Sequence, residues 1–174
     1  IAFPMNDRPG IMMASAIRSY LNRYGVAAGQ NVTLFASNDD AHRTALDLME
    51  SGIEIAGVID PREDAVAQGD YPLFAGAEVI STRGRQALQE ITIRHRGAER
   101  QIVTDCLGVS GGWNPTLHLT CHMNGRPVWD ETIAGFVPAP GAVPGMTPAG
   151  ACNGTYSTAG CMIAGVEAAR AALT

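Results

Sequence analysis

The sequence predicts an α/β fold, and three observations carry this prediction. Residues 31–36 are rich in β-branched and aromatic side chains at alternating positions, as in a strand. Residues 41–49 place apolar side chains at helical spacing, and Gly52 follows as a stop signal. Residues 53–59 form a nearly continuous apolar run, which suits a strand buried on both faces of a parallel sheet. Strand, helix and strand in this order open a nucleotide-binding α/β domain.

The segments on either side of this unit are predicted from the same signals. Residues 11–24 repeat apolar side chains at helical spacing and are followed by Gly25, so they predict a helix. After the unit we expect a helix of about two turns at residues 62–68 and a third parallel strand at residues 77–80.

The second half of the chain begins with alternating segments. Residues 88–94 and 101–105 alternate around Gly97, which predicts an antiparallel pair, and residues 106–110 continue as a last apolar strand. Residues 137–154 are rich in Pro, Gly and Ala and predict a crossing between layers or subdomains. A closing helix is expected at residues 156–173.

A three-stranded parallel unit joined to an antiparallel hairpin is typical of the second domain of two-dinucleotide flavoproteins. We therefore predict a Rossmann-like NAD(P)-binding domain of the disulfide-reductase flavoprotein type, with an antiparallel β-hairpin and a returning segment of a first FAD/NAD domain. Residues 1–28 are predicted to link from that first domain, residues 29–110 to form the nucleotide-binding domain, and residues 111–174 to return to the first domain.

Composition narrows the function classes. The chain has 174 residues, 46% of them hydrophobic, and a formal net charge of -5, which argues against nucleic acid as a partner. No apolar run is long enough to cross a bilayer, so no membrane partner is expected. The four cysteines show no C-x-x-C pair, which predicts reduced thiols in a cytoplasmic protein. The chain opens on Ile1 and reads as a piece of a larger polypeptide.

The turn after the strand at residues 31–36 is the first candidate cofactor site. It carries Ser37, Asn38, Asp39 and Asp40 where a Gly-x-Gly-x-x-Gly motif is expected. Asp39 or Asn38 can cap the following helix. The two carboxylates would repel a pyrophosphate, but a nucleotide can still face the turn with its ribose or base, or through a bridging cation.

Asp60 ends the strand at residues 53–59, about twenty residues beyond the turn, where an acidic residue usually accepts the ribose hydroxyls of a nucleotide. Asp-Pro-Arg is also an ordinary turn sequence, and both interpretations stay open.

A third candidate segment, from Gly111 to Pro115, follows the strand at residues 106–110. Gly111 and Gly112 permit close approach of a backbone to a ligand. Asn114 can cap a helix that begins at Pro115, whose fixed φ suits a first helical position. Trp113 is either a ligand contact or a packing residue.

No catalytic residue and no metal site is predicted. His118 and His122 are four residues apart on a predicted short helix, but no third zinc ligand follows at a recognisable spacing. No Ser-His-Asp or paired-carboxylate arrangement can be assembled, and the cysteines lack the close pair of a redox disulfide.

Several stretches of the chain resemble the α subunits of heterotetrameric sarcosine oxidases. They are Ala2-Phe-Pro-Met-Asn-Asp-Arg-Pro-Gly-Ile-Met12, Tyr20-Leu-Asn-Arg-Tyr-Gly-Val26, Ser37-Asn-Asp-Asp-Ala41, Val109-Ser-Gly-Gly-Trp-Asn-Pro-Thr116 and Ala149-Gly-Ala-Cys152. The resemblance spans nearly the whole chain, and Ser110-Gly-Gly-Trp-Asn-Pro-Thr116 is its most specific part.

This resemblance implies a function for the parent protein. The family oxidatively demethylates sarcosine to glycine, with formaldehyde and hydrogen peroxide as products, and so acts on CH-NH donors. The amine is oxidised at a flavin of the β subunit, a second flavin (FAD or FMN) lies at the α/β interface, and the α subunit carries NAD. Our chain would be the middle of such an α subunit, inactive alone, with the flavin-bearing β subunit as its chief partner.

The resemblance also bears on the stretch before the closing helix. In related flavoproteins the matching stretch ends in Gly-Asp, and that acid holds the flavin ribitol. Gly150 is kept here but Ala151 replaces the acid, which favours NAD or another nucleotide over FAD at this position. Two other hypotheses remain, namely a segment of a related amine or imino-acid dehydrogenase with FAD or ATP, and a scaffold with a vestigial nucleotide site.

Overall fold

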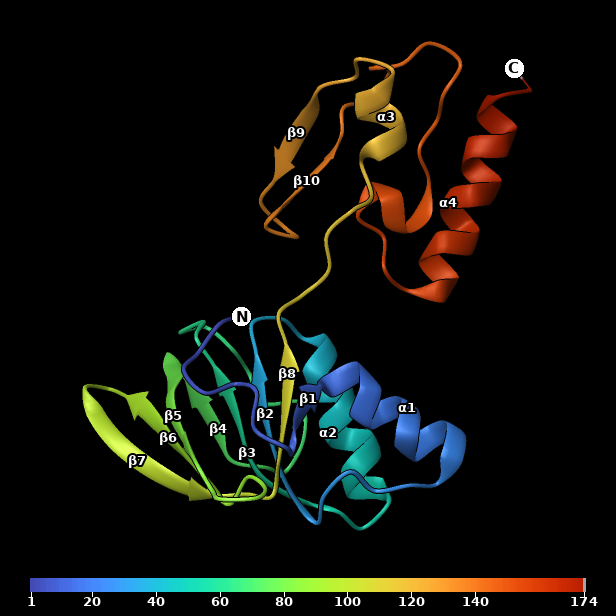
Figure 1. The fold of residues 1–174 in the computed structure, drawn as a ribbon. Coiled ribbons are helices and arrows are strands. Elements are labelled where there is room, and N and C mark those ends of the chain that lie inside the picture. The colour runs from blue at the N-terminus through green and yellow to red at the C-terminus, as the bar shows by residue number, and fades with distance from the viewer. Residues whose placement is uncertain (174) are drawn as a thin grey trace. The chain divides into compact units, whose positions relative to one another are not determined.

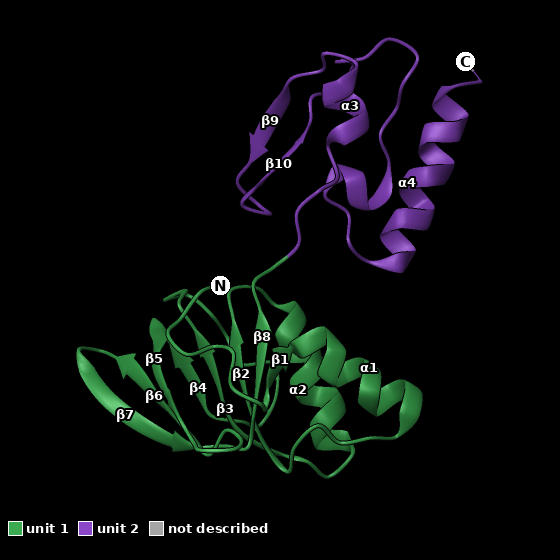
Figure 2. Ribbon diagram, viewed as in Figure 1, with its two compact units in different colours: residues 1–112 green, residues 113–174 purple. Residues whose placement is uncertain are grey.

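The computed structural model describes residues 1–173. Its chain divides into two compact units, Ile1–Gly112 and Trp113–Thr174 (Figure 2). The first unit contains, in order, β1 (Ile11–Met13), α1 (Ala14–Tyr24), β2 (Asn31–Ala36), α2 (Asp40–Glu50), β3 (Glu54–Asp60), β4 (Leu73–Ala75), β5 (Ala77–Arg83), β6 (Glu90–His95), β7 (Ala98–Val103) and β8 (Cys106–Ser110). Residues 1–28, predicted as a linking segment, thus contribute β1 and α1 to the same unit as the nucleotide-binding elements.

The first unit has three layers (Figure 1). Its central sheet has five parallel strands in the order β1-β8-β2-β3-β4. Helices α1 and α2 pack on one face, where Ile17 and Leu48 meet Leu34 in one buried cluster. A second sheet, in the order β5-β6-β7, covers the other face, where Ile91 and Ile93 join a cluster with residues of the central sheet. The α/β Rossmann-like prediction is confirmed.

Two segments of the first unit, residues 11–13 and residues 77–80, differ from the prediction. Residues 11–13 were expected to be helical, but they form β1 because their backbone pairs in parallel with β8 from Ile11 to Met13. Residues 77–80 were expected as the third parallel strand, but they belong to β5, which pairs antiparallel with β6. Gly76, at φ +69°, separates β5 from β4, the parallel neighbour of β3. This left-handed conformation, which favours glycine, lets the chain leave one sheet and enter the other.

The helix predicted at residues 62–68 is absent from the described chain, and a turn and loop stand there instead. The Arg62 N–H donates to Asp60 Oδ1 at 2.9 Å, which is the hydrogen bond of an Asx turn. At the other end, the Gln68 N–H donates to the Tyr71 hydroxyl at 3.1 Å. These side-chain contacts replace the backbone bonds of a helix.

The second unit contains α3 (His118–His122), β9 (Pro127–Asp130), β10 (Gly135–Pro138), the short 3₁₀ helix η1 (Gly150–Asn153) and α4 (Thr158–Ala171). The β9–β10 hairpin was not predicted, because each strand has only four residues and little alternation. The closing helix is confirmed as α4, and Ser157 caps it by accepting the Gly160 N–H at 3.1 Å. A helix starting at Pro115 is wrong, since α3 starts three residues later.

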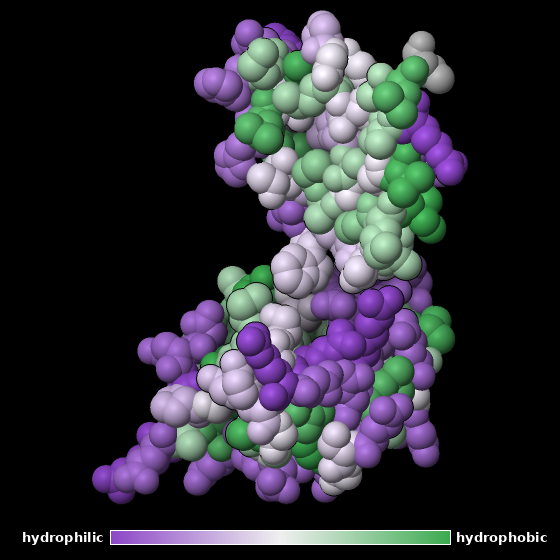
Figure 3. All heavy atoms as spheres, turned by 90° about the vertical axis from the view of Figure 1, so that its right-hand side faces the viewer, coloured by the Kyte–Doolittle hydropathy of each residue, from purple (hydrophilic) through white to green (hydrophobic). Residues whose placement is uncertain are grey.

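Helix α4 has no buried residue among those described. Met162, Ile163 and Val166 are 69%, 60% and 51% exposed, and Figure 3 shows apolar side chains gathered over this helix. Contiguous exposed apolar faces are typical of interaction surfaces.

Candidate functional site

The turn after β2 is bonded directly to the end of β8. Strand β2 lies between β8 and β3 in the sheet, so the carboxyl ends of these three strands share one edge. The Ser37 N–H donates to Ser110 O at 3.1 Å, and the Ser37 hydroxyl donates to Gly111 O at 3.3 Å. The Asn38 amide donates to Ser110 O at 3.0 Å. The strand order, and not the strand direction, changes here: from β2 the chain proceeds to β3 and β4 on one side and later returns to β8 on the other. Open α/β sheets bind ligands at such a point.

Asn38, and not Asp39, supplies the side-chain cap of α2. Its Oδ1 accepts the Asp40 N–H at 3.0 Å and also accepts the Ser110 hydroxyl at 3.2 Å. Asp39 occupies the N-cap position but makes no capping hydrogen bond through its side chain. The predicted cap by Asn38 is therefore confirmed, and the predicted side-chain cap by Asp39 is wrong. The Asp39 carboxylate pairs with a cation instead.

That cation is Arg62, which bridges Asp39 and Asp60. Arg62 Nη2 lies 2.7 Å from Asp39 Oδ1 and 2.8 Å from Asp60 Oδ2. Arg62 Nε donates to Asp60 Oδ1 at 3.1 Å, so the contact with Asp60 uses both carboxylate oxygens. The Asp60 side chain is 0% exposed, whereas that of Asp39 is 69% exposed. The hydrogen bonds to Asp60 raise the pKa of Arg62 above its usual range, against the effect of burial.

His42 lies in the first turn of α2 and is fully buried. Its Nδ1 is 2.5 Å from the Tyr71 hydroxyl, which itself accepts the Gln68 N–H. Both ring tautomers of a neutral His42 satisfy this contact, because Tyr71 can donate its proton to a bare Nδ1 or accept Nδ1–H through its second lone pair. Within the described residues, Nε2 has no hydrogen-bond partner. Burial lowers the pKa of His42, although Asp39 and Asp60 act to raise it.

Gly111 and Gly112 close the first unit at the end of β8. Gly112 has φ +96°, and a Cβ there would lie 3.6 Å from the Asn38 amide nitrogen. A larger side chain at this point would enter the space beside the β2 turn. The predicted residues Ser37, Asn38, Asp39, Asp60, Gly111 and Gly112 are thus all placed along one edge of the sheet, as the topology and hydrogen bonds require.

The other predicted residues lie in the second unit. Trp113 is 54% exposed, and its carbonyl accepts the Tyr156 hydroxyl at 3.0 Å. Asn114 is exposed and Pro115 is buried. Gly150 is buried with φ +71° at the start of η1, and Ala151 follows it as an exposed residue.

The carboxyl ends of β2, β3 and β8, with the turn after β2, are called the β2 edge below. Arg62 and Ser110 are residues of the β2 edge that sequence reasoning missed. Arg62 follows Asp60 by two residues, so an Asx turn would have placed it at the strand end. Ser110 is the last residue of β8 and faces the β2 turn through three hydrogen bonds with Asn38. The contacts of Arg62 with Asp39 and of Ser110 with Asn38 join residues that are distant in the sequence, and no local pattern predicts them.

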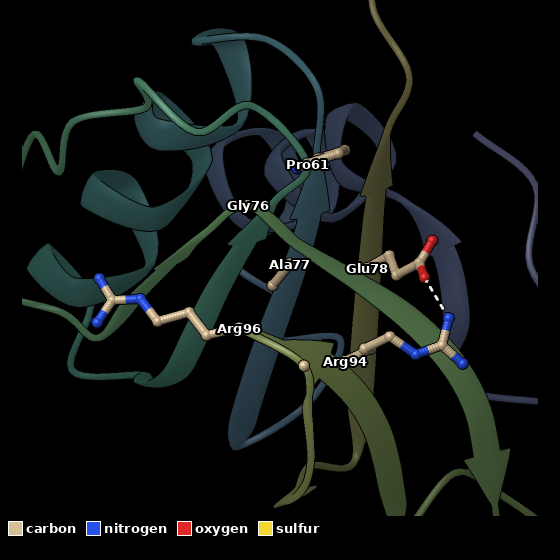
Figure 4. Close-up of a pocket in the computed structure, with 7 residues that line it drawn as sticks. Pro61, Gly76, Ala77, Glu78, Arg94 and Arg96 are labelled. Carbon is tan, nitrogen blue, oxygen red and sulfur yellow. Dashed lines mark hydrogen bonds and ion pairs between the residues drawn. The ribbon is translucent and has the colours of Figure 1, made fainter.

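A cavity of about 290 Å³ lies in the first unit but contains none of the predicted site residues (Figure 4). Its lining residues are Pro61, Gly76, Ala77, Glu78, Arg94, Arg96 and Gly97. Arg94 pairs with Glu78 at 2.7 Å, and the Arg96 side chain points away from that pair (Figure 4). The two guanidinium groups therefore do not converge on one ligand, and we place the candidate site at the β2 edge.

The thiols and histidines form no further centre in the described part of the chain. All four cysteines are free, and burial raises the pKa of the Cys106 thiol to about 12. His118 and His122 lie at the two ends of α3. Among residues 1–173, no three His, Cys, Asp or Glu side chains are grouped so that they could hold a metal ion. In the same residues, no helix has the length and apolar character needed to span a membrane.

The residues at the carboxyl ends of β2, β3 and β8 suit a nucleotide in two respects, whereas the pairing of Asp60 with Arg62 opposes a direct contact with ribose. The glycine at φ +96° and the start of α2 suit a close-lying ligand. Asp60, however, has no exposed surface and gives both oxygens to Arg62, so a direct contact with ribose hydroxyls would require Arg62 to move. Arg62 stands between Asp60 and solvent.

Comparison with known structures supports the fold. The thioredoxin reductase of T. acidophilum matches 89% of this chain and 54% of its own, with a TM-score of 0.63 and 18% identity. The thioredoxin reductase of Lactococcus lactis matches 83% of this chain and 52% of its own, with a TM-score of 0.60 and 13% identity. The L-proline dehydrogenase of P. horikoshii matches 80% of this chain and 24% of its own, with a TM-score of 0.56 and 17% identity.

Comparison of sequences points to one family. No family model matches the chain. It is 40% identical over 173 residues to sarcosine oxidase subunit alpha of Rhizobium meliloti (strain 1021), which covers 98% of this chain and 17% of the relative. It is 38% identical over 188 aligned positions to the protein of the same name from Corynebacterium sp. (strain P-1), which covers 100% of this chain and 19% of the relative. The resemblance to sarcosine oxidase α subunits is thus confirmed across nearly the whole chain. The matching segment spans less than a fifth of the length of those relatives.

Proposed function

We propose that this chain is a nucleotide-binding segment of the α subunit of a sarcosine oxidase. The observation that carries the proposal is the 36 to 40% identity to three proteins named sarcosine oxidase subunit alpha over 95 to 100% of the chain. The parent complex would demethylate sarcosine oxidatively to glycine, formaldehyde and hydrogen peroxide. The amine oxidation would take place at a flavin of the β subunit, so this chain holds a cofactor and contributes no group to the reacting amine.

NAD is the nucleotide we propose for the edge formed by β2, β3 and β8. Its pyrophosphate would lie between Gly112 and the first turn of α2, where backbone N–H groups and the helix dipole favour an anion. Asp39 and Asp40 oppose a phosphate at that turn, and the pairing of Asp39 with Arg62 offsets part of this repulsion. When bound, NAD supplies hydride transfer chemistry; the residues of this chain bind and orient it.

The first test is calorimetric titration of the chain with NAD, FAD and ATP in parallel. We expect saturable binding of NAD alone, and no peroxide from sarcosine when FAD is added. A preference for FAD or ATP would contradict the NAD assignment and favour a related amine or imino-acid dehydrogenase.

A pair of glycine variants locates the site. Gly112→Val places a branched side chain beside the β2 turn, at φ +96°, and should weaken NAD binding by about tenfold or more. Gly141→Val is the matched control, since Gly141 has φ +67° but no atom lies within 4 Å of its would-be Cβ. Equal losses in both variants would place the effect in backbone strain and contradict the proposed position of the nucleotide.

A scaffold with a vestigial site is the second candidate, and one observation favours it. Polar groups at these strand ends already bind one another, since Arg62 pairs with Asp60 and the β2 turn bonds to the end of β8. Absence of binding to all three nucleotides, together with capture of a flavin-bearing β subunit, would support this candidate and contradict the first.

A further inference from the structure

The contact between Arg62 and Asp60 sets what a nucleotide at this edge would meet. Asp60 stands at the end of β3, where a carboxylate commonly accepts ribose hydroxyls. Its side chain is 0% exposed, and Arg62 uses its backbone N–H, Nε and Nη2 to cover both oxygens. A ligand that approaches this strand end therefore meets Arg62 before it meets Asp60.

Asp60, more than Asp39, keeps Arg62 in place. The Asp39 carboxylate is 69% exposed, and exposed ion pairs contribute little because water screens them. The Asp60 carboxylate is fully buried, and a buried charge must keep its partner. Arg62 is further fixed through its backbone, since its carbonyl accepts the Gly76 N–H at 3.1 Å.

The guanidinium keeps binding capacity after these contacts are made. The Arg62 side chain is 36% exposed, and within the described residues no hydrogen bond of its Nη1 is recorded. An arginine can donate a hydrogen bond from such a nitrogen while its flat face stacks on an aromatic ring. Two carboxylates already balance its charge, so it suits a neutral ring or hydroxyl better than a phosphate.

We propose that Arg62 is the ligand-facing residue of an adenosine subsite and that Asp60 is the buried positioning residue that holds its guanidinium. This inference rests on the proposed function, because it assumes a nucleotide at the β2 edge. The subsite would take the adenine ring or the ribose hydroxyls of the adenosine half of NAD. Asp60 acts through Arg62 and does not touch the ligand.

Two variants test the roles of Arg62 and Asp60 by calorimetry with NAD and with ADP-ribose. Arg62→Lys keeps a cation for Asp60 but removes the planar guanidinium. The double variant Asp60→Asn with Arg62→Gln replaces the ion pair by two amides and so leaves no buried charge unpaired. Arg94→Lys is the matched control, because Arg94 makes a similar 2.7 Å contact with Glu78 far from the edge in sequence and outside the predicted site.

We expect both site variants to weaken NAD and ADP-ribose by the same factor, about tenfold, and Arg94→Lys to leave both affinities within about twofold of the unaltered chain. If the unaltered chain binds NAD and Arg62→Lys binds it equally well or more tightly, Arg62 does not face the ligand and this inference alone is wrong. A loss in the double variant without a loss in Arg62→Lys would make Asp60 the direct contact and overturn the inference as well. Failure of the unaltered chain to bind either probe would overturn the inference together with the proposed function.

Discussion

The two units of this chain differ in how far they bury their own apolar side chains. Ile1–Gly112 holds both hydrophobic clusters, with Ile17, Leu34 and Leu48 at 0% exposure. In Trp113–Thr174, as far as the structure describes it, Val143 is the one buried hydrophobic residue apart from small glycine and proline positions. The first unit thus has a hydrophobic core of its own, whereas the second exposes apolar side chains on α4.

This difference agrees with the prediction that residues 111–174 return to a first dinucleotide domain, which stays a prediction. The relatives are more than five times longer than the segment they share with this chain, which spans 17 to 19% of their length. If residues 111–174 return to such a domain, the exposed Met162 and Ile163 of α4 are the side chains that it would cover. The first unit, by contrast, buries two hydrophobic clusters among its own residues.

The largest change in stability is expected when the cation beside Asp60 is removed from the first unit. Arg62→Gln leaves a fully buried carboxylate without its partner and should lower the free energy of unfolding by about 3–5 kcal/mol. Arg94→Gln breaks an exposed pair and should cost less than about 1 kcal/mol. Urea denaturation followed by far-UV circular dichroism measures both changes. Similar small losses in the two variants would show that the Asp60 contact is not part of a closed core.

A core substitution compares the two units directly. Leu48→Ala removes a fully buried side chain from α2 and should cost about 2–5 kcal/mol. Ile163→Ala changes a side chain of α4 that is 60% exposed and should change stability by less than about 0.5 kcal/mol. Both tryptophans, Trp113 and Trp129, lie in the second unit, so their fluorescence reports on that unit while circular dichroism reports on both. A loss at Ile163 as large as that at Leu48 would contradict the contrast.

A smaller effect is expected from pH. Burial lowers the pKa of His42 below the value of 6.5 that it regains on unfolding, so the unfolded chain binds more protons in this range. The stability contributed by neutral His42 is therefore complete above pH 6.5 and falls as the pH drops toward the folded pKa. The expected slope is at most about 1.4 kcal/mol per pH unit. Denaturation between pH 7.5 and 5 should show this loss in the unaltered chain, and His42→Gln should flatten it; identical slopes would contradict a buried neutral His42.

Local patterns predicted the centre of the first unit and missed its long-range contacts. Residues 31–36 and 106–110 were placed correctly because alternation and apolar runs are properties of the strand itself. Residues 11–13 fit helical spacing equally well, and only their pairing with β8, almost a hundred residues away, makes them a strand. Whether residues 11–13 form a strand or a helix depends on a pairing partner that lies far outside their own stretch of sequence.

The candidate site shows the same division. The turn after β2 and Asp60 at the end of β3 were located from the strand, helix and strand order alone. The bridge through Arg62 was not predicted. It links Asp60 to Asp39, and Asp39 is 23 positions before Arg62 in the sequence. The Asp39 carboxylate pairs with Arg62 and makes no capping hydrogen bond to α2, and the sequence around Asp39 does not distinguish these two contacts.

Amide hydrogen exchange of the chain with and without saturating NAD tests the central claim most directly, since it reports where a nucleotide lies as well as whether it binds. The account predicts slower exchange at residues 37–42, 60–62 and 110–112, at the carboxyl ends of β2, β3 and β8, and unchanged exchange in β6 and β7. Slower exchange confined to residues 150–157, or no change anywhere, would contradict a nucleotide site at this edge.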